Sequence, residues 1–285
     1  MVKVFVPTEN KIQVRRSVDL PLVAQERRHF GRGLTYFGLP SEGLYDILDW
    51  KDYLSKIVAV EKGEPQEPAR KQALLIANAI RLGLSDRLVL LRGEINRIIL
   101  DGKDDYGTRL EFPFELCNFD YGGSLLYPDR VRVDALETFV LRQRPFDFLI
   151  FITTNVREFD KPELGETLDR VKTEISQLSR PETYPNLDTF CEWVNSEPVQ
   201  EQVLHVQYLL KNLGEFNRYH VCAYPPVLYE GSNQTRLLHY AFTFRFQKGA
   251  STRVVSPQSL IEVLNLPLQV LRDSHLRETE RRVRL

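Results

Sequence analysis

The sequence predicts an α/β fold with a mostly parallel sheet and helices on both faces, and three observations support this prediction. Short, strongly apolar segments alternate with longer ones whose apolar residues recur at helical spacing. This alternation is typical of parallel strands joined by right-handed crossovers. The chain has 285 residues, 42% of them hydrophobic, which is enough for one large α/β domain or two small ones.

The first half of the chain follows a β-α-β-α-β pattern. Its predicted elements are a strand at 34–40, a helix at 44–53, a strand at 56–61, a helix at 67–82 and a strand at 88–91. The segment 56–61 is almost entirely apolar before it ends at Glu61, as expected of a strand buried on both faces. The helix at 67–82 carries Ala73, Leu74, Ala77 and Ile80 at helical spacing.

The second half continues the pattern and ends in an antiparallel pair of strands. Its predicted elements are a strand at 112–119, a helix at 130–142, a strand at 146–154, a helix at 164–178, a helical segment at 190–213 broken at Pro198, and strands at 219–224 and 237–246. Prolines and a glycine join the last two strands, which we expect to pair as in a hairpin. Residues 260–271 are amphipathic but are interrupted by Pro267.

These elements divide the chain into three parts. Residues 1–33 form a basic N-terminal extension, and residues 34–250 form the main domain, with a helical insertion around 180–215. Residues 251–285 form a charged C-terminal tail that we expect to be helical. Four of its arginines, Arg277, Arg281, Arg282 and Arg284, form a local cluster that can contact phosphates, although a charged terminal helix is more often simply solvated.

Composition restricts the partners and the compartment. The 38 basic and 39 acidic residues nearly cancel, so a nucleic acid would have to bind through local arginine clusters rather than through an overall field. Cys117, Cys191 and Cys222 are odd in number and widely spaced, which argues against a disulfide framework. No apolar run approaches the ~20 residues that span a bilayer. We therefore expect a cytoplasmic protein with no membrane partner.

Several common chemistries lack their motifs. The chain contains no GxxxxGK[ST] phosphate loop, no GxSxG elbow and no HExxH pair. Its five histidines are scattered, whereas histidines that bind a metal normally show paired spacing. We therefore predict no metal site.

The most informative segment is 118–124, Asn-Phe-Asp-Tyr-Gly-Gly-Ser, where an apolar strand ends in polar residues and glycines. In an open α/β sheet, ligands bind beyond the carboxyl ends of the strands, so Asn118, Asp120 and Tyr121 are candidate catalytic residues. The alternative is a tight turn that favours Asn, Asp and Gly for backbone reasons alone.

Parallel β/α units followed by an antiparallel pair resemble the class I S-adenosylmethionine-dependent methyltransferases. The resemblance implies a Rossmann-like methyltransferase fold with a seven-stranded, mostly parallel sheet, an antiparallel final strand and helices on both faces. It also implies S-adenosylmethionine as cofactor. Glu61 stands where that family places the acid for the ribose hydroxyls, and Glu94 where it places an acidic turn beside the adenine. An exposed acid that merely ends a strand is the alternative for Glu61.

The segment 116–154 is similar to the tRNA guanine dimethyltransferase family and related nucleic-acid methyltransferases. That resemblance implies that Asp120 orients the acceptor amine and accepts a proton. In another register, similar to the adenine and cytosine amino-methyltransferases, Asn118 would bind the exocyclic amine and Tyr121 would stack on the base. The prolines of that family are missing here, so we favour the first register.

The loop after the first strand differs from the family. Class I enzymes have an acid and several glycines there, because the backbone approaches the cofactor closely. This chain has Gly38, Ser41 and Gly43, which we predict as cofactor-binding, but it also has Leu39 and Pro40. The segment 31–33, Gly-Arg-Gly, is another candidate for the loop, although no strand precedes it.

Two functions are compatible with these features. The first is a methyltransferase that acts on an amine, in the finer prediction an amine of a nucleic acid base. The second is a methyltransferase-like chain that has lost the donor and serves as a binding or assembly subunit with a protein partner. The intrusion of Leu39 and Pro40 favours the second.

Overall fold

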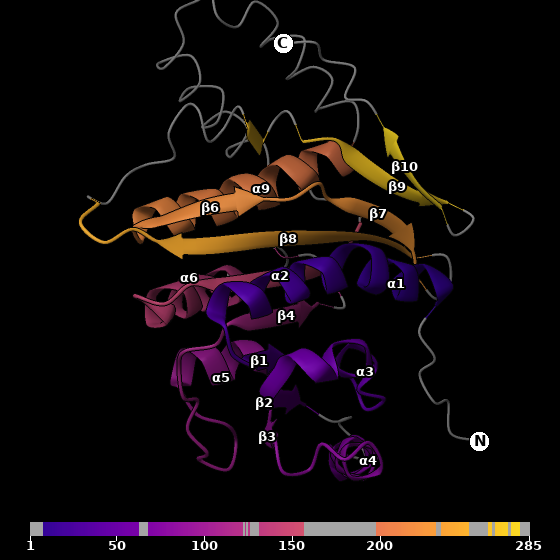
Figure 1. Ribbon diagram of the computed structural model, residues 1–285, viewed down its shortest axis with the longest axis vertical. Coiled ribbons are helices and arrows are strands. Elements are labelled where there is room, and N and C mark those ends of the chain that lie inside the picture. The colour runs from indigo at the N-terminus through magenta and orange to yellow at the C-terminus, as the bar shows by residue number, and fades with distance from the viewer. Residues whose placement is uncertain are drawn as a thin grey trace, which may run out of the picture.

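The computed structural model of the chain describes residues 8–62, 68–121, 123, 125, 131–156, 198–231, 235–250, 262–263, 266–272 and 275–279. This part of the chain builds one sheet of ten strands with helices on both faces (Figure 1). The strands are β1 (Leu34–Gly38), β2 (Leu54–Glu61), β3 (Leu88–Arg92), β4 (Leu116–Asp120), β5 (Phe148–Asn155), β6 (Tyr219–Ala223), β7 (Val227–Glu230), β8 (Arg236–Phe246), β9 (Leu268–Arg272) and β10 (His275–Thr279).

The strand order explains the fold class. From the edge at β3 the order is β3-β2-β1-β4-β5-β8, and every neighbouring pair is parallel except β5 and β8. The first five strands thus have the 3-2-1-4-5 order of a Rossmann-like sheet. The predicted fold class, a mostly parallel α/β sheet followed by antiparallel strands, is confirmed.

The antiparallel part is larger than predicted. Strands β6 and β7 pair with successive stretches of the same edge of β8. On its other side β7 pairs with β9, and β9 in turn pairs with β10. The sheet therefore has ten strands instead of the seven that the resemblance implied. The prediction of a helical C-terminal tail is wrong for residues 268–272 and 275–279, which form β9 and β10. Pro267 cannot continue a helix, and the free edge of β7 accepts β9 as a neighbour.

Helices cover both faces of the sheet (Figure 1). They are α1 (Glu9–Val14), the π-helical segment η1 (Arg15–Asp19), α2 (Leu20–Phe30), α3 (Tyr45–Trp50), the 3-10 segment η2 (Lys51–Tyr53), α4 (Pro68–Arg81), α5 (Ile95–Asp101), α6 (Val131–Gln143) and α9 (Pro198–Phe216). Buried residues of α5, α6 and α9 share one core cluster. Those of α2, α3 and α4 share another. The residues predicted as an N-terminal extension therefore pack on the sheet from position 8 onward.

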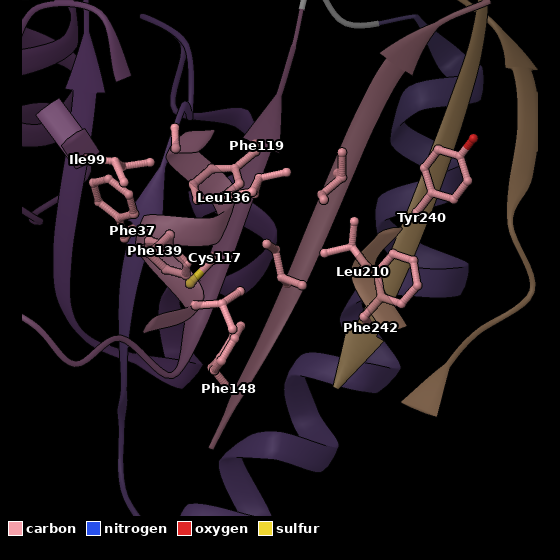
Figure 2. Packing of buried hydrophobic residues seen from close by; sticks show 14 of the residues in the cluster. Phe37, Ile99, Cys117, Phe119, Leu136, Phe139, Phe148, Leu210, Tyr240 and Phe242 are labelled. Atoms are coloured by element: carbon pink, nitrogen blue, oxygen red, sulfur yellow. The ribbon is translucent and has the colours of Figure 1, made fainter. Parts of the chain in front are cut away.

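Aromatic side chains fill the core on the α6 side (Figure 2). Phe139 of α6 stacks on Phe37 at 5.8 Å between ring centroids and meets Phe119 edge to face at 5.3 Å. Farther along the sheet, Phe148 stacks on Phe244 at 4.4 Å. These contacts hold β1, β4, β5 and β8 together beneath α6. Of these residues, Phe37 and Phe119 lie next to the carboxyl ends of β1 and β4, where the candidate site is built.

Two predicted segments differ in extent or lie outside the described residues. The strand predicted at 112–119 begins only at Leu116, because the buried Gln143 side chain takes both backbone groups of Phe114. Its amide donates to the Phe114 carbonyl at 2.7 Å and accepts from the Phe114 N–H at 2.9 Å. The helix predicted at 164–178, Cys191 and the first part of the insertion around 180–215 lie outside the described residues.

Candidate active site

A cavity of about 530 Å³ lies at the carboxyl ends of the parallel strands, where ligands bind in open α/β sheets. Its volume is within the ~300–1,000 Å³ range of small-molecule sites. Residues from β1 to β8 and from the N-terminal helix line it: Thr8, Lys11, Leu39, Ser41, Glu42, Val60, Glu61, Lys62, Lys71, Asp120, Tyr121, Asn155, Gly231, Thr235 and Leu237. The cavity thus brings together Ser41, Glu61, Asp120 and Tyr121 of the predicted site.

Asp120 ends β4 and forms an ion pair with Lys11 of α1. The two side chains remain 26% and 17% exposed, respectively, so the carboxylate faces the cavity without being sealed off. Burial acts to lower the pKa of Lys11, but the Asp120 and Asp46 carboxylates outweigh it and raise this pKa above its usual value. Lys11 is therefore a cation, and Asp120 has a positive partner supplied by the chain itself.

Asn118 lies on the same face of β4 but deeper. Its amide donates to Asp46 at 2.7 Å, and Asp46 also pairs with Arg15, with 2.6 Å between Nε and Oδ1. All three side chains are buried. Burial raises the pKa of Asp46, although the Arg15 and Lys11 cations act in the opposite direction. Asn118 is not among the residues that line the cavity; its side chain instead links β4 to α3 beneath the site.

Tyr121 and Glu94 make contacts within the protein. The Tyr121 hydroxyl donates to Asn96 at 3.2 Å, and the Arg132 guanidinium lies over its ring at 5.0 Å. Burial raises the pKa of Tyr121 far above its usual value. Glu94 caps α5: one carboxylate oxygen accepts from the Arg97 N–H at 3.0 Å and the other from the Asn96 amide at 2.7 Å. Glu94 is not among the residues that line the cavity.

Glu61 ends β2, as the sequence predicted, and lines the cavity. Its backbone is fixed on both sides, because its carbonyl accepts from the Gln72 amide at 3.2 Å and from the Gly93 N–H at 3.3 Å. The backbone of Glu61 is thus held by the sheet and by α4, and a rigid backbone is what a residue that binds a ligand requires.

In the loop after β1, some of the predicted cofactor-binding residues line the cavity and others do not. Ser41 lines the cavity with a positive φ of 59°, within a turn in which its carbonyl accepts from the Leu44 N–H at 3.2 Å. Gly38 is needed for packing, since a Cβ there would lie 2.2 Å from the Asn118 carbonyl oxygen. Gly43 likewise adjoins the Tyr45 ring, and neither glycine lines the cavity. Leu39 does line it.

Sequence reasoning missed Lys11, Arg15 and Asp46. Lys11, Arg15 and Asp19 recur every four residues, so they share one side of the N-terminal helices, and each pairs with a residue from another part of the chain. That spacing of charges was the available signal.

Among the described residues, no group of three His, Cys, Asp or Glu side chains could hold a metal ion. No helix in the described ranges is long and apolar enough to cross a membrane.

Comparisons with known proteins give only distant matches. No protein-family model matches the chain, and no curated protein matches it. A putative O-methyltransferase from Klebsiella pneumoniae is 14% identical, with 80% of each chain covered and a TM-score of 0.42. The O-methyltransferase TomG from Streptomyces achromogenes, in complex with SAM, is 11% identical, with 86% of this chain and 93% of that chain covered and a TM-score of 0.44. Cofactor-bound Rv0187 from MTB is 12% identical, covering 87% of this chain and 84% of that one, with a TM-score of 0.44.

Similarity at this level does not assign the chain to a family. The fold class rests on the strand order, and the candidate site rests on the cavity and its lining residues.

Proposed function

We propose that the protein is an S-adenosylmethionine-dependent methyltransferase that acts on an amine. One observation carries this proposal: a single cavity at the carboxyl ends of β1, β2 and β4 is lined by Ser41, Glu61 and Asp120. These are three of the positions that the sequence resemblance assigns to the cofactor and the acceptor. The finer proposal, that the amine belongs to a nucleic acid base, rests on the resemblance of residues 116–154 alone.

The residues of the cavity suit this chemistry. S-adenosylmethionine, when bound, supplies a methyl group on a positively charged sulfur. The Glu61 carboxylate can accept hydrogen bonds from two hydroxyl groups of a ribose. Asp120 can orient an amine and accept its proton. Such a transfer depends mainly on positioning the reactants, so a few well-placed polar groups are sufficient.

Calorimetric titration of the full-length chain with S-adenosylmethionine tests the proposal. A saturable single site with a dissociation constant in the micromolar range supports a methyltransferase. No heat at millimolar ligand contradicts it.

Glu61→Gln measures the contribution of the proposed ribose ligand. The variant should fold normally but lose about 1–3 kcal/mol of binding free energy for S-adenosylmethionine, because a charge-assisted hydrogen bond is imperfectly replaced. Titration of both proteins gives this difference. Glu111→Gln, at a carboxylate that is 76% exposed, is the matched control and should bind like the wild type. Unchanged affinity in Glu61→Gln removes Glu61 from the site.

Asp120→Ala separates binding from transfer. The variant should abolish methyl transfer while cofactor affinity stays within about tenfold, since the lost interaction belongs to the acceptor and the transition state. Transfer of a labelled methyl group to amine acceptors, beside the same titration, measures both quantities. Undiminished transfer by Asp120→Ala contradicts the assignment.

The second candidate is a binding or assembly subunit that has lost the donor site. Two contacts favour it: Leu39 lines the cavity where the family has glycine, and both carboxylate oxygens of Glu94 are taken up by the cap of α5. If the protein has this function, the titration with S-adenosylmethionine should give no heat of binding. Purification of the tagged chain from its own cells, followed by size analysis, should then yield a stable complex with another protein.

A further inference from the structure

The helix α1 separates two cavities. A second cavity, of about 660 Å³, lies on the other side of α1, between that helix and the strands β7 and β9. Its lining includes Glu9, Asn10, Tyr229, Glu230 and Arg236. Thr8 and Gly231 line both cavities, so the two spaces adjoin at the start of α1. A displacement of α1 would therefore join them.

Within the described residues, one small apolar cluster and polar contacts anchor α1. Val14 is its only buried residue, and it packs in a small cluster with Val227, Tyr229 and Leu271. The Asn10 amide donates to the Glu230 carbonyl at 3.1 Å. Lys11 forms an ion pair with Asp120. In contrast, α2 is fixed by Val23, which is fully buried in the main core on its side of the sheet.

An irregular helical segment lies between α1 and α2. Residues 15–19 form the π-helical segment η1, an arrangement that often marks a functional site or an irregularity in a helix. The Ser17 hydroxyl donates to the Gln13 carbonyl at 2.6 Å, and such a bond from a side chain to the preceding turn tends to bend a helix. The segment η1 is therefore the irregular point between α1 and α2, and its last residue, Asp19, is anchored to His239 of β8.

We infer that Lys11 is the residue that controls access to Asp120, and that α1 is a gate that turns at η1 when a positively charged ligand group replaces the Lys11 ammonium. The ammonium lies at the carboxylate where, under the proposed function, the charged sulfur or the acceptor amine would be attracted. A neutral ligand gains little by displacing a cation from Asp120, whereas a cation substitutes for it. The ligand class expected at this end of the cavity is therefore a sulfonium or an amine.

The first experiment follows α1 without any ligand. Hydrogen exchange of residues 8–19 is measured by mass spectrometry in the wild type and in Lys11→Met, Lys11→Arg and Asp120→Asn. We expect exchange about three- to tenfold faster in the Met and Asn variants, because local opening costs less when an anchoring contact is lost. Lys11→Arg keeps the charge and should exchange like the wild type. The control, Lys56→Met, removes an exposed lysine that pairs with Glu111 at 3.5 Å and should change nothing at α1.

The second experiment tests the charge of the ligand and is the part that rests on the proposed function. S-adenosylmethionine carries a positive sulfur and S-adenosylhomocysteine a neutral one. Lys11→Met should bind S-adenosylmethionine about tenfold more tightly than the wild type does, because Asp120 no longer has an internal partner, and should change S-adenosylhomocysteine affinity by less than about twofold. Equal changes for both ligands overturn the role of charge.

The two proposals fail in different ways. If no variant binds either ligand, the proposed function fails, and the exchange data alone decide whether α1 is a gate. If exchange of residues 8–19 is the same in Lys11→Met, Asp120→Asn and the wild type, the gate is overturned, whatever the ligands do.

Discussion

Asp104 shows how one carboxylate organises the backbone around it. It follows α5 and accepts N–H groups of Arg92 at 3.0 Å, Tyr106 at 2.9 Å and Thr108 at 2.8 Å. Burial acts to raise the pKa of Asp104, but the three backbone donors outweigh it and lower this pKa below its usual value of 3.8. The side chain therefore ties the end of β3 to the turn after α5.

Replacing Asp104 should make stability depend less on pH. A carboxyl group with a lowered pKa in the folded state stabilises the protein above its unfolded pKa and loses this effect as the pH falls through the folded pKa. Asp104→Ala should thus reduce the free energy of unfolding by about 1–3 kcal/mol at pH 7. The difference should narrow only below about pH 4.

Urea unfolding at several pH values measures this difference. Asp101→Ala, at an exposed carboxylate in the last turn of α5, is the control and should change stability little. A difference that stays constant down to the lowest pH at which both proteins fold contradicts the prediction.

Single residues of the site were predictable where they end a strand or follow one closely. Glu61 and Asp120 follow apolar runs, so the sequence placed them at the correct edge of the sheet, where both line the cavity. Lys11 and Asp46 were missed because their partners lie 109 positions away, at Asp120, and 72 positions away, at Asn118. The sequence pattern around a residue contains no information about contacts between positions so far apart. The catalytic roles themselves stay predictions.

At the scale of elements, Gly214 sets how closely α9 approaches the sheet. A Cβ at this position would lie 2.0 Å from the Val221 methyl of β6 and 3.0 Å from the Phe244 ring of β8. An alanine in the interior of a helix normally stabilises it relative to glycine by up to about 1 kcal/mol. Here the contact with a stiff, branched side chain opposes that gain.

Gly214→Ala should therefore destabilise the protein by about 1–3 kcal/mol, as overpacking does in tight cores. Urea unfolding measures the effect, and Val221→Ala provides the internal control. In the Val221→Ala background the same substitution should be neutral or stabilising, since the room it needs is then available. A loss that is equal in both backgrounds shows that the clash is not its cause.

Elements with a clear hydrophobic period were predicted well, and those defined by their neighbours were not. The strand at β2 and the helices α4 and α6 agree with prediction to within a few residues. The strands β9 and β10 were not recognised, because a short amphipathic segment fits a helix as well as a strand until a sheet edge is available. The late start of β4 depends on Gln143, which no local pattern connects with Phe114.

At the scale of the whole molecule, buried polar contacts join the N-terminal helices to the last long strand. Asp19 at the end of η1 lies 2.7 Å from His239 Nε2 on β8, and the other ring nitrogen lies 2.9 Å from the Thr153 hydroxyl on β5. Glu26 of α2 pairs with Arg245 at the other end of β8. These contacts attach η1 and α2 to the sheet.

Removing Asp19 should weaken this attachment. Asp19→Ala leaves the buried Nε2 atom of His239 without its Asp19 partner, so the free energy of unfolding should fall by about 1.5–3 kcal/mol. Thermal or urea unfolding measures the loss. His239→Phe is the second substitution of a double-mutant cycle. In the His239→Phe background, Asp19→Ala should lower the free energy of unfolding by clearly less than it does in the wild type. Additive losses in the cycle show that the two side chains do not interact.

The same contacts have a consequence for synthesis of the chain. Asn10 meets Glu230, Asp19 meets His239, and Glu26 meets Arg245, across 220, 220 and 219 positions of the sequence. A ribosome adds about 5–20 residues per second, so the first helices emerge roughly 10–50 s before the strand that receives them. During that interval Asn10, Asp19 and Glu26 lack the partners that they have in the folded protein, so these three contacts form only after β7 and β8 have been made.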